Sequence, residues 1–148
     1  EAIEKGQADM EWMLERCVRI KTTVVQNDEY DTGERMLLNF GHTYGHAIEK
    51  VSGYTKYTHG EAVAIGMLKA CEIGQKLGVT PDGTKERIQA VLEKWHLPTT
   101  TDLPMEELYQ TMLSDKKKLN GKVYFVVLKE IGDAKTCPLS EQELKDLL

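Results

Sequence analysis

The segment from Glu61 to Leu77 places the strongest constraint on the fold of this chain. Its sequence, EAVAIGMLKACEIGQKL, is rich in Ala and Leu and has polar residues mainly in its second half. Such a composition predicts a largely buried helix, because a helix that is apolar around most of its circumference needs cover from other elements. Gly78 ends the predicted helix. The remaining elements must therefore enclose this segment.

Most of the surrounding segments are also predicted to be helical. Residues 8–27 and about 35–51 carry apolar residues at helical spacing. Thr80-Pro81 indicates the start of another helix, because Pro suits the first helical position. The inner face of that helix is expected to contain Ile88, Val91, Leu92 and Trp95.

The C-terminal part of the sequence predicts a small β element between two helices. A short helix is expected over 104–113, and KVYFVVL at 122–128 is the one strong strand signal. The following IGDAKTC is expected to pair back on this strand as a hairpin. Ser140 and Glu143 form a capping box for a last helix. The sequence therefore predicts a mainly α fold, a multi-helix domain over 1–148 with one small β-hairpin.

Composition restricts the classes of function. The 148 residues carry a net charge of −5, which argues against a nucleic-acid partner, because binding phosphates needs a basic face. No apolar run is long enough to predict a membrane span. The three cysteines, at 17, 71 and 137, have no pairing pattern and indicate reduced thiols in a cytoplasmic protein. The opening EAIEKG, with neither Met nor helix cap, is interpreted as the start of a piece of a longer protein.

Residues 39–49, NFGHTYGHAIE, contain the first candidate functional residues. His42 and His46 stand four positions apart, so both rings would project from one helix face, as metal-binding imidazoles often do. Thr43 replaces the Glu of a zinc-protease HExxH motif, which excludes that class. Such a histidine pair can also be purely structural. Gly41 and Gly45 indicate that something approaches the backbone closely, either a ligand or a neighbouring helix.

Further polar residues extend this pattern in both directions. Arg35, Asn39, His42, His46 and Glu49 follow one another at steps of four, three, four and three, which would place all five on one face of one helix. A solvated face could look the same. A third histidine, His59, precedes the buried helix in HGEAVAIGM. Glu61 would lie in the first turn of that helix, where a carboxylate is favoured in any case.

Together these motifs resemble the 3-dehydroquinate synthase family. The similarity includes RIKTTVV, ERMLLNFGHTYGHAIE, HGEAVAIGM, LPT and DKK, and covers nearly the whole chain. Members of this family convert 3-deoxy-D-arabino-heptulosonate 7-phosphate to 3-dehydroquinate and phosphate in the shikimate pathway. That pathway leads to chorismate and the aromatic amino acids, and the reaction requires NAD and a divalent metal.

The resemblance implies that this sequence is the C-terminal helical domain of a two-domain, NAD- and metal-dependent lyase. The preceding domain, an NAD-binding α/β domain, is absent here, so the piece alone is expected to be inactive. The full-length protein is expected to be a homodimer.

The resemblance also implies roles for individual residues. His42 and His59 would bind the metal, zinc or else cobalt, with a third ligand, a Glu, expected upstream of this sequence. His46 would form hydrogen bonds in the site and assist proton transfer. The anionic sugar-acid phosphate would be bound by four further residues: Lys21, Arg35, Asn39 and Lys117.

Three alternatives remain open from the sequence. Other sugar-phosphate cyclases, the inosose and valiolone synthases, share the histidines, although the intact DKK motif favours the shikimate enzyme. Metal-dependent polyol dehydrogenases have a similar two-domain layout but lack GHTxGHAIE. A non-enzymatic helical module that binds a metal or a partner is the third.

Overall fold

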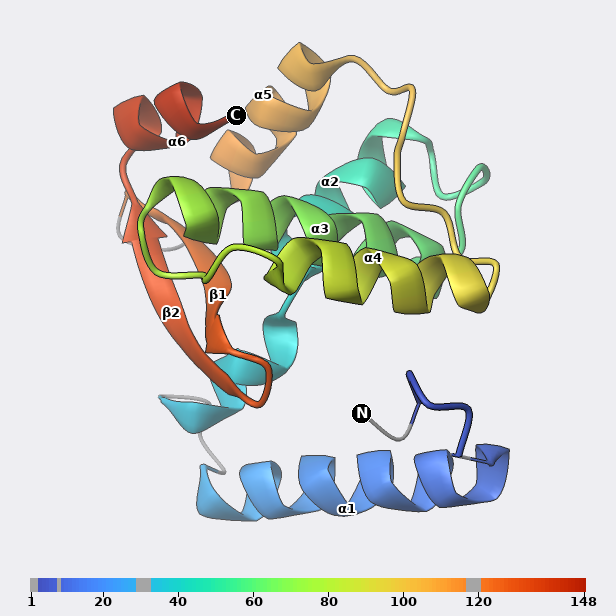
Figure 1. Ribbon diagram of the computed structural model, residues 1–148. Helices are drawn as coiled ribbons and strands as arrows, with labels where there is room; N and C mark the ends of the chain where they lie inside the picture. Colours follow the sequence, from blue (N-terminus) through green and yellow to red (C-terminus); the bar gives the residue numbers. More distant parts are fainter. Residues whose placement is uncertain (1–2, 8, 29–32, 117–120) are drawn as a thin grey trace. The chain divides into compact units, whose positions relative to one another are not determined.

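The computed structural model describes residues 3–7, 9–28, 33–116 and 121–148 (Figure 1). The chain forms two compact units, Glu1–Leu38 and Asn39–Leu148. The predicted mainly α fold with one hairpin is confirmed, since helices make up most of the structure and a single two-stranded antiparallel sheet is found in the described part.

The first unit contains the helix α1 (Met10–Asn27). Asp9 caps its N-terminus and accepts a hydrogen bond of 2.7 Å from the backbone N–H of Trp12. The helix predicted over 8–27 is therefore confirmed, but none of its residues is buried. Several of its apolar side chains are well exposed, and Val18 retains 63% of its accessible surface. A helix of this length without buried side chains draws little stability from its own hydrogen bonds.

The second unit is built around α3. Its elements follow in the order α2 (His42–Val51), α3 (His59–Lys76), α4 (Thr84–Lys94), α5 (Met105–Lys116), β1 (Val123–Glu130), β2 (Asp133–Leu139) and α6 (Glu141–Leu147). Figure 1 shows α3 crossing this unit, with α4 along one side and the hairpin at one end. α3 packs on α2, α4 and β1. Ten of its residues are buried, as the apolar sequence of this segment predicts.

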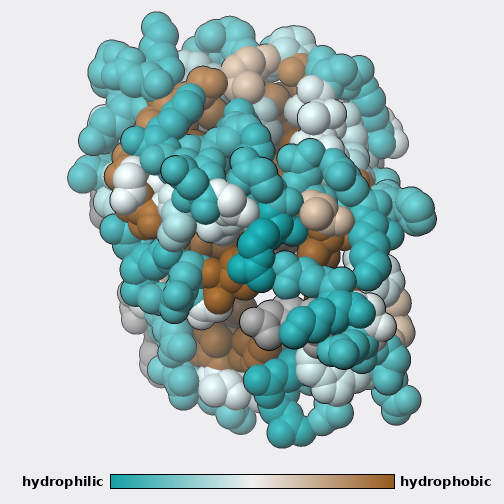
Figure 2. All heavy atoms as spheres, in the orientation of Figure 1, coloured by the Kyte–Doolittle hydropathy of each residue, from teal (hydrophilic) through white to brown (hydrophobic). Residues whose placement is uncertain are grey.

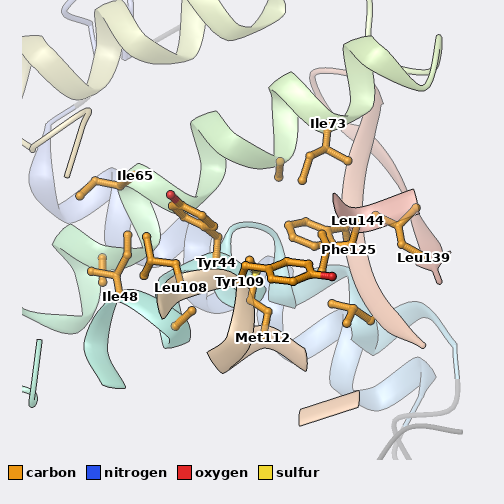
Figure 3. Packing of buried hydrophobic residues seen from close by; sticks show 14 of the residues in the cluster. Tyr44, Ile48, Ile65, Ile73, Leu108, Tyr109, Met112, Phe125, Leu139 and Leu144 are labelled. Atoms are coloured by element: carbon orange, nitrogen blue, oxygen red, sulfur yellow. The ribbon is translucent and has the colours of Figure 1, made fainter. Parts of the chain in front are cut away.

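The core of the second unit joins every helix except α4 to both strands. β1 and β2 pair antiparallel, with Val123 opposite Leu139 at one end of the ladder. Figure 3 shows side chains from α2, α3, α5, α6 and the hairpin packed in one continuous cluster. The largest members of this cluster with almost no accessible surface are Phe125, Ile48, Ile73, Leu108 and Leu144. The hairpin is therefore part of the core rather than an appendage.

The prediction of one continuous helix over 35–51 is wrong. A 3-10 helix, η1 (Glu34–Asn39), ends before α2 begins at His42, and Gly41 between them has the left-handed φ of 82°. The reason is the approach of α3. A Cβ on Gly41 would lie 2.7 Å from the carbonyl oxygen of Val63, and one on Gly66 would overlap the backbone of Gly41. Of the two explanations for the motif's glycines, helix packing is the one observed.

The predicted start of α4 at Pro81 is also wrong, since the helix begins three residues later. Thr80 is buried and its hydroxyl donates a 2.8 Å hydrogen bond to the carbonyl oxygen of Leu128 in β1. This bond holds the chain in a turn through Pro81, and Gly83 then caps α4 with a left-handed φ of 83°. Of the expected inner face, Leu92 is buried, whereas Trp95 is exposed.

The surface is dominated by hydrophilic residues in the view of Figure 2. None of the helices in the described ranges is both long enough and apolar enough to traverse a lipid bilayer. The three cysteines form no disulfide; Cys71 is buried and Cys17 exposed.

The close contact between α2 and α3 can be tested by adding a methyl group at a glycine in the contact. Gly66→Ala should lower the free energy of unfolding by about 1–3 kcal/mol, because overpacking outweighs the higher helix propensity of Ala. Gly60→Ala, in the same helix but with no atom near the added methyl, is the matched control and should leave stability unchanged or slightly increased. Urea unfolding of both variants measures the difference, and equal stabilities would contradict the packing argument.

Candidate metal and catalytic site

Three histidines from two helices lie together at one edge of the second unit. His42 and His46 are one turn apart on α2, and His59 is the first residue of α3. The centroid of the His59 ring lies 5.1 Å from that of His42 and 5.9 Å from that of His46, and the His42 and His46 centroids are 5.4 Å apart. Residues separated in sequence thus form one imidazole cluster.

The start of α3 is fixed by a capping box. The Thr58 hydroxyl accepts a hydrogen bond from the Glu61 backbone N–H, and a Glu61 carboxylate oxygen accepts one of 2.7 Å from the Thr58 N–H. The Thr58 backbone N–H, followed by its hydroxyl, lowers the pKa of Glu61. Glu61 therefore has a local structural role, as its position in the first turn suggested, and the box sets the backbone of His59.

Two of the imidazoles have an oxygen next to Nδ1. Nδ1 of His42 lies 3.2 Å from the carbonyl oxygen of Phe40, and Nδ1 of His59 lies 3.1 Å from a carboxylate oxygen of Glu49. A carbonyl oxygen and an ionised carboxylate only accept hydrogen bonds, so each Nδ1 carries the proton. In the neutral form of each ring, the lone pair is then on Nε2. This is how imidazole ligands are usually held when Nε2 binds a metal.

Burial favours the neutral form of His42. Desolvation lowers the pKa of this imidazole below its ordinary value, and the neighbouring His46 and His59 act in the same direction. The Phe40 carbonyl and Glu49 oppose the shift. Because only a neutral imidazole binds a metal, the environment of His42 suits a ligand.

His46 differs from the other two histidines. Its side chain is exposed, and no described residue forms a hydrogen bond with its ring. His46, Glu49 and His59 nevertheless offer ligand atoms that all lie within 4.8 Å of one another, so they are a second possible metal-binding set. The assignment of His42 and His59 as the ligands stays a prediction.

Glu49 is the residue whose importance sequence reasoning missed. It was noticed only as the last member of the polar series on α2, with no role of its own. Its carboxylate is largely buried, with 12% of the side-chain surface accessible, and contacts His59. The signal was present in the sequence, because Glu49 follows His46 by three positions and so lies on the same helix face.

The other predicted site residues are distributed over both units. Lys21 is exposed on α1, and Arg35 is half-buried in η1; both belong to the first unit. The Arg35 backbone N–H donates a 3.0 Å hydrogen bond to the carboxylate of Asp28, which fixes this part of the chain. Asn39, exposed, begins the second unit. Lys117 lies outside the described residues.

A separate hollow with a mixed polar and apolar lining lies between α3, α4 and the segment before α5. Its volume is about 240 Å³. Glu72 is paired there with two lysines, Lys85 and Lys69, the latter at 2.7 Å. Desolvation of Glu72 is outweighed by the two lysine hydrogen bonds, which keep the pKa of its carboxyl low. The paired charges make this an ion-pair cluster that joins α3 to α4.

The fold of this chain is similar to that of part of two solved enzymes. One is a 2-deoxy-scyllo-inosose synthase in complex with carbaglucose-6-phosphate, NAD+ and Co2+; the TM-score is 0.76 at 23% identity, over 93% of this chain and 41% of that one. The other is a 2-epi-5-epi-valiolone synthase of Streptomyces hygroscopicus with NAD+ and Zn2+ bound. Its TM-score is 0.77 at 22% identity, and the match covers 90% of this chain and 38% of that one.

Sequence comparison identifies the family to which the chain belongs. The family model described as 3-dehydroquinate synthase C-terminal matches residues 1–118. The chain is 43% identical to the 3-dehydroquinate synthase of Enterococcus faecalis over 142 residues, which are 95% of this chain and 40% of that protein. It is 43% identical to the Clostridium acetobutylicum synthase over 139 residues, 93% of this chain and 38% of that one. The chain therefore belongs to the 3-dehydroquinate synthase family and spans about 40% of the length of such relatives.

The capping box at His59 has a matched control in the same molecule. Thr58→Ala should lower the free energy of unfolding by about 1 kcal/mol, and Ser140→Ala, which removes the equivalent box of α6, should do the same. Only Thr58→Ala should shift the ring resonances of His59 in NMR spectra, because only that box sets its backbone. Equal changes at His59 in both variants would contradict this role.

Proposed function

We propose that this chain is the metal- and substrate-binding part of a 3-dehydroquinate synthase, which converts 3-deoxy-D-arabino-heptulosonate 7-phosphate to 3-dehydroquinate and phosphate. The observation that carries the proposal is the imidazole cluster. The family's GHTYGH and HGE motifs meet there, and two of the three rings have Nδ1 beside an oxygen acceptor. A structural histidine pair would not need this arrangement of lone pairs.

His42 and His59 are the metal ligands in this proposal. The donor set fits zinc or cobalt, because both metals bind neutral imidazole nitrogens and both rings are held with Nε2 unprotonated. When bound, the metal would act as a Lewis acid on a substrate oxygen. The third protein ligand would come from outside this chain.

The remaining residues would bind and orient the substrate and move protons. His46 suits proton transfer because its ring is exposed and not committed to a protein partner among the described residues. Lys21, Arg35 and Lys117 would bind the carboxylate and phosphate of the anionic substrate, and Asn39 would donate a hydrogen bond. These roles come from the match to the family motifs.

NAD would be bound mainly by the part of the protein outside this chain, an N-terminal α/β domain. The two cyclases with the same fold contain NAD+ and a divalent metal, which supports both cofactors here. We further propose that the exposed apolar side chains of α1 pack against that domain, because about 60% of the length of the relatives lies outside the match. A homodimeric, cytoplasmic enzyme completes the proposal, and the absence of disulfides agrees with a reducing compartment.

Phosphate release tests the activity. The full-length protein that contains this sequence, supplied with NAD+, zinc or cobalt and the heptulosonate phosphate, should release phosphate and form dehydroquinate. The 148-residue chain under the same conditions should release none, because it lacks the third ligand and the nucleotide-binding domain. Sugar phosphates used by the inosose and valiolone synthases are the control substrates. Release from one of these, but not from the heptulosonate, would replace the proposed substrate.

Single substitutions separate the metal ligands from the proton-transfer residue. In the full-length protein, His42→Ala and His59→Ala should each lower zinc affinity by at least about 100-fold, since each removes a ligand. His46→Ala should leave zinc affinity within a few-fold while phosphate release falls by about 10²–10⁴. Competition with a chromophoric chelator and a phosphate assay measure the two effects. Loss of zinc binding in His46→Ala with retention in His42→Ala would instead favour the set His46, Glu49 and His59.

A further inference from the structure

We infer that Glu49 is a positioning residue that holds His59 in the tautomer and orientation needed for metal binding. The inference builds on the proposed function where it concerns the metal. The contact between the two side chains, however, involves residues of this chain alone and can be tested without adding a metal. Glu49 would act through His59 rather than on the substrate or the metal.

The contact joins the last turn of α2 to the first residue of α3. Glu49 lies near the end of α2, and His59 opens α3 after a seven-residue connection. One Glu49 carboxylate oxygen is 3.1 Å from Nδ1 of His59. The His59 side chain is 55% exposed, whereas that of Glu49 is 12% exposed. The carboxylate is therefore the fixed partner, and the ring is the side chain that needs an anchor.

The backbone around Glu49 is itself held firmly. Its carbonyl oxygen accepts a 2.8 Å hydrogen bond from the backbone N–H of Tyr54 and a 3.1 Å bond from the hydroxyl of Ser52. Both bonds close the end of α2, so the carboxylate starts from a defined position. Its preceding neighbour Ile48 is fully buried in the core. A largely buried carboxylate on α2 thus contacts a more exposed ring at the start of α3.

The electrostatic consequence favours metal binding. A carboxylate that accepts the Nδ1 proton places the lone pair on Nε2 and makes that nitrogen a stronger donor. His42 reaches the same state through the Phe40 carbonyl. In both rings an oxygen acceptor beside Nδ1 leaves Nε2 available, although the acceptor is a carbonyl for His42 and a carboxylate for His59. The ring of His46 is not held in this way, because it has no hydrogen-bond acceptor among the described residues.

Glu49 could also be considered as a metal ligand, because ligand atoms of Glu49, His46 and His59 lie within 4.8 Å of one another. A metal on Glu49 would compete for the carboxylate that contacts Nδ1 of His59. His42, whose ring is already held with Nε2 available, would then have no role. The positioning role is favoured because the contact of Glu49 with Nδ1 leaves Nε2 of His59 for the metal, as the Phe40 carbonyl does for His42.

Glu49→Ala and Glu49→Gln in the 148-residue chain test the inference, with Glu107→Gln as the control for loss of an exposed carboxylate. Nitrogen-15 NMR at about pH 8.5, above the usual titration range of imidazole, reports the tautomer of each ring. His59 should carry its proton on Nδ1 in the wild type and in Glu107→Gln. In Glu49→Ala it should change to Nε2–H, which free imidazole side chains prefer. Glu49→Gln should be intermediate, because its amide oxygen still accepts the proton.

Zinc affinity provides the second readout, in the same chain and in the full-length protein. Glu49→Ala should bind zinc about 10–100-fold more weakly, and Glu49→Gln should lose less. An unchanged His59 tautomer in Glu49→Ala would overturn the inference. The visible and X-ray absorption spectra of the cobalt-loaded protein provide a second contradiction. If Glu49→Ala had one oxygen ligand fewer than the wild type, Glu49 would be a metal ligand, and the inference would be wrong. The tautomer of His59 could change in Glu49→Ala while neither the wild-type chain nor the full-length protein binds zinc. That outcome would support the positioning of His59 by Glu49 and refute the proposed metal site.

Discussion

The close contact between α2 and α3 determines the position of every histidine in the cluster. Gly41, Gly45 and Gly66 allow the two backbones to approach so closely that a methyl group on Gly66 would overlap the carbonyl of Gly41. The short separation of the helices brings the ring centroid of His59, at the start of α3, to 5.1 Å from that of His42 and 5.9 Å from that of His46 on α2. The glycines of the motif are thus as much a part of the site as the imidazoles. They set the spacing, and the imidazoles supply the chemistry.

The hairpin holds this helix pair from the other side. Thr43, between the two glycines, donates a 2.6 Å hydrogen bond to the carbonyl of Tyr124 in β1, and Thr80 bonds to Leu128 in the same strand. One strand therefore fixes the first turn of α2 and the chain after α3. Thr43 was useful in the sequence mainly because it excluded a protease motif. In the structure it ties the histidine-bearing helix to the sheet.

The sequence was a good guide to the elements and a poorer guide to their junctions. Three local signals predicted elements correctly: apolar composition predicted α3, β-rich residues predicted the hairpin, and the pair Ser140 and Glu143 predicted the capping box of α6. The break at Gly41 and the late start of α4 were missed because both follow from tertiary contacts, with Val63 in one case and Leu128 in the other. Motif matching selected the three histidines that the fold brings together. It did not reveal Glu49, since its partner is ten residues away across a loop.

The two units differ in how much of their structure they support themselves. The second unit has a continuous core beneath the histidines, so the imidazole cluster is formed by residues 39–148 without help from elsewhere. α1 has no buried residue, although Lys21, a proposed substrate ligand, lies on it. A charged side chain on a helix without buried residues is weakly fixed, and the entropy of ordering it opposes the binding of an anion. The histidines of the proposed metal site, by contrast, lie on two helices that share one core. In the proposed function, Lys21 would gain comparable order when the remainder of the full-length protein covers α1, and this would link substrate binding to domain assembly.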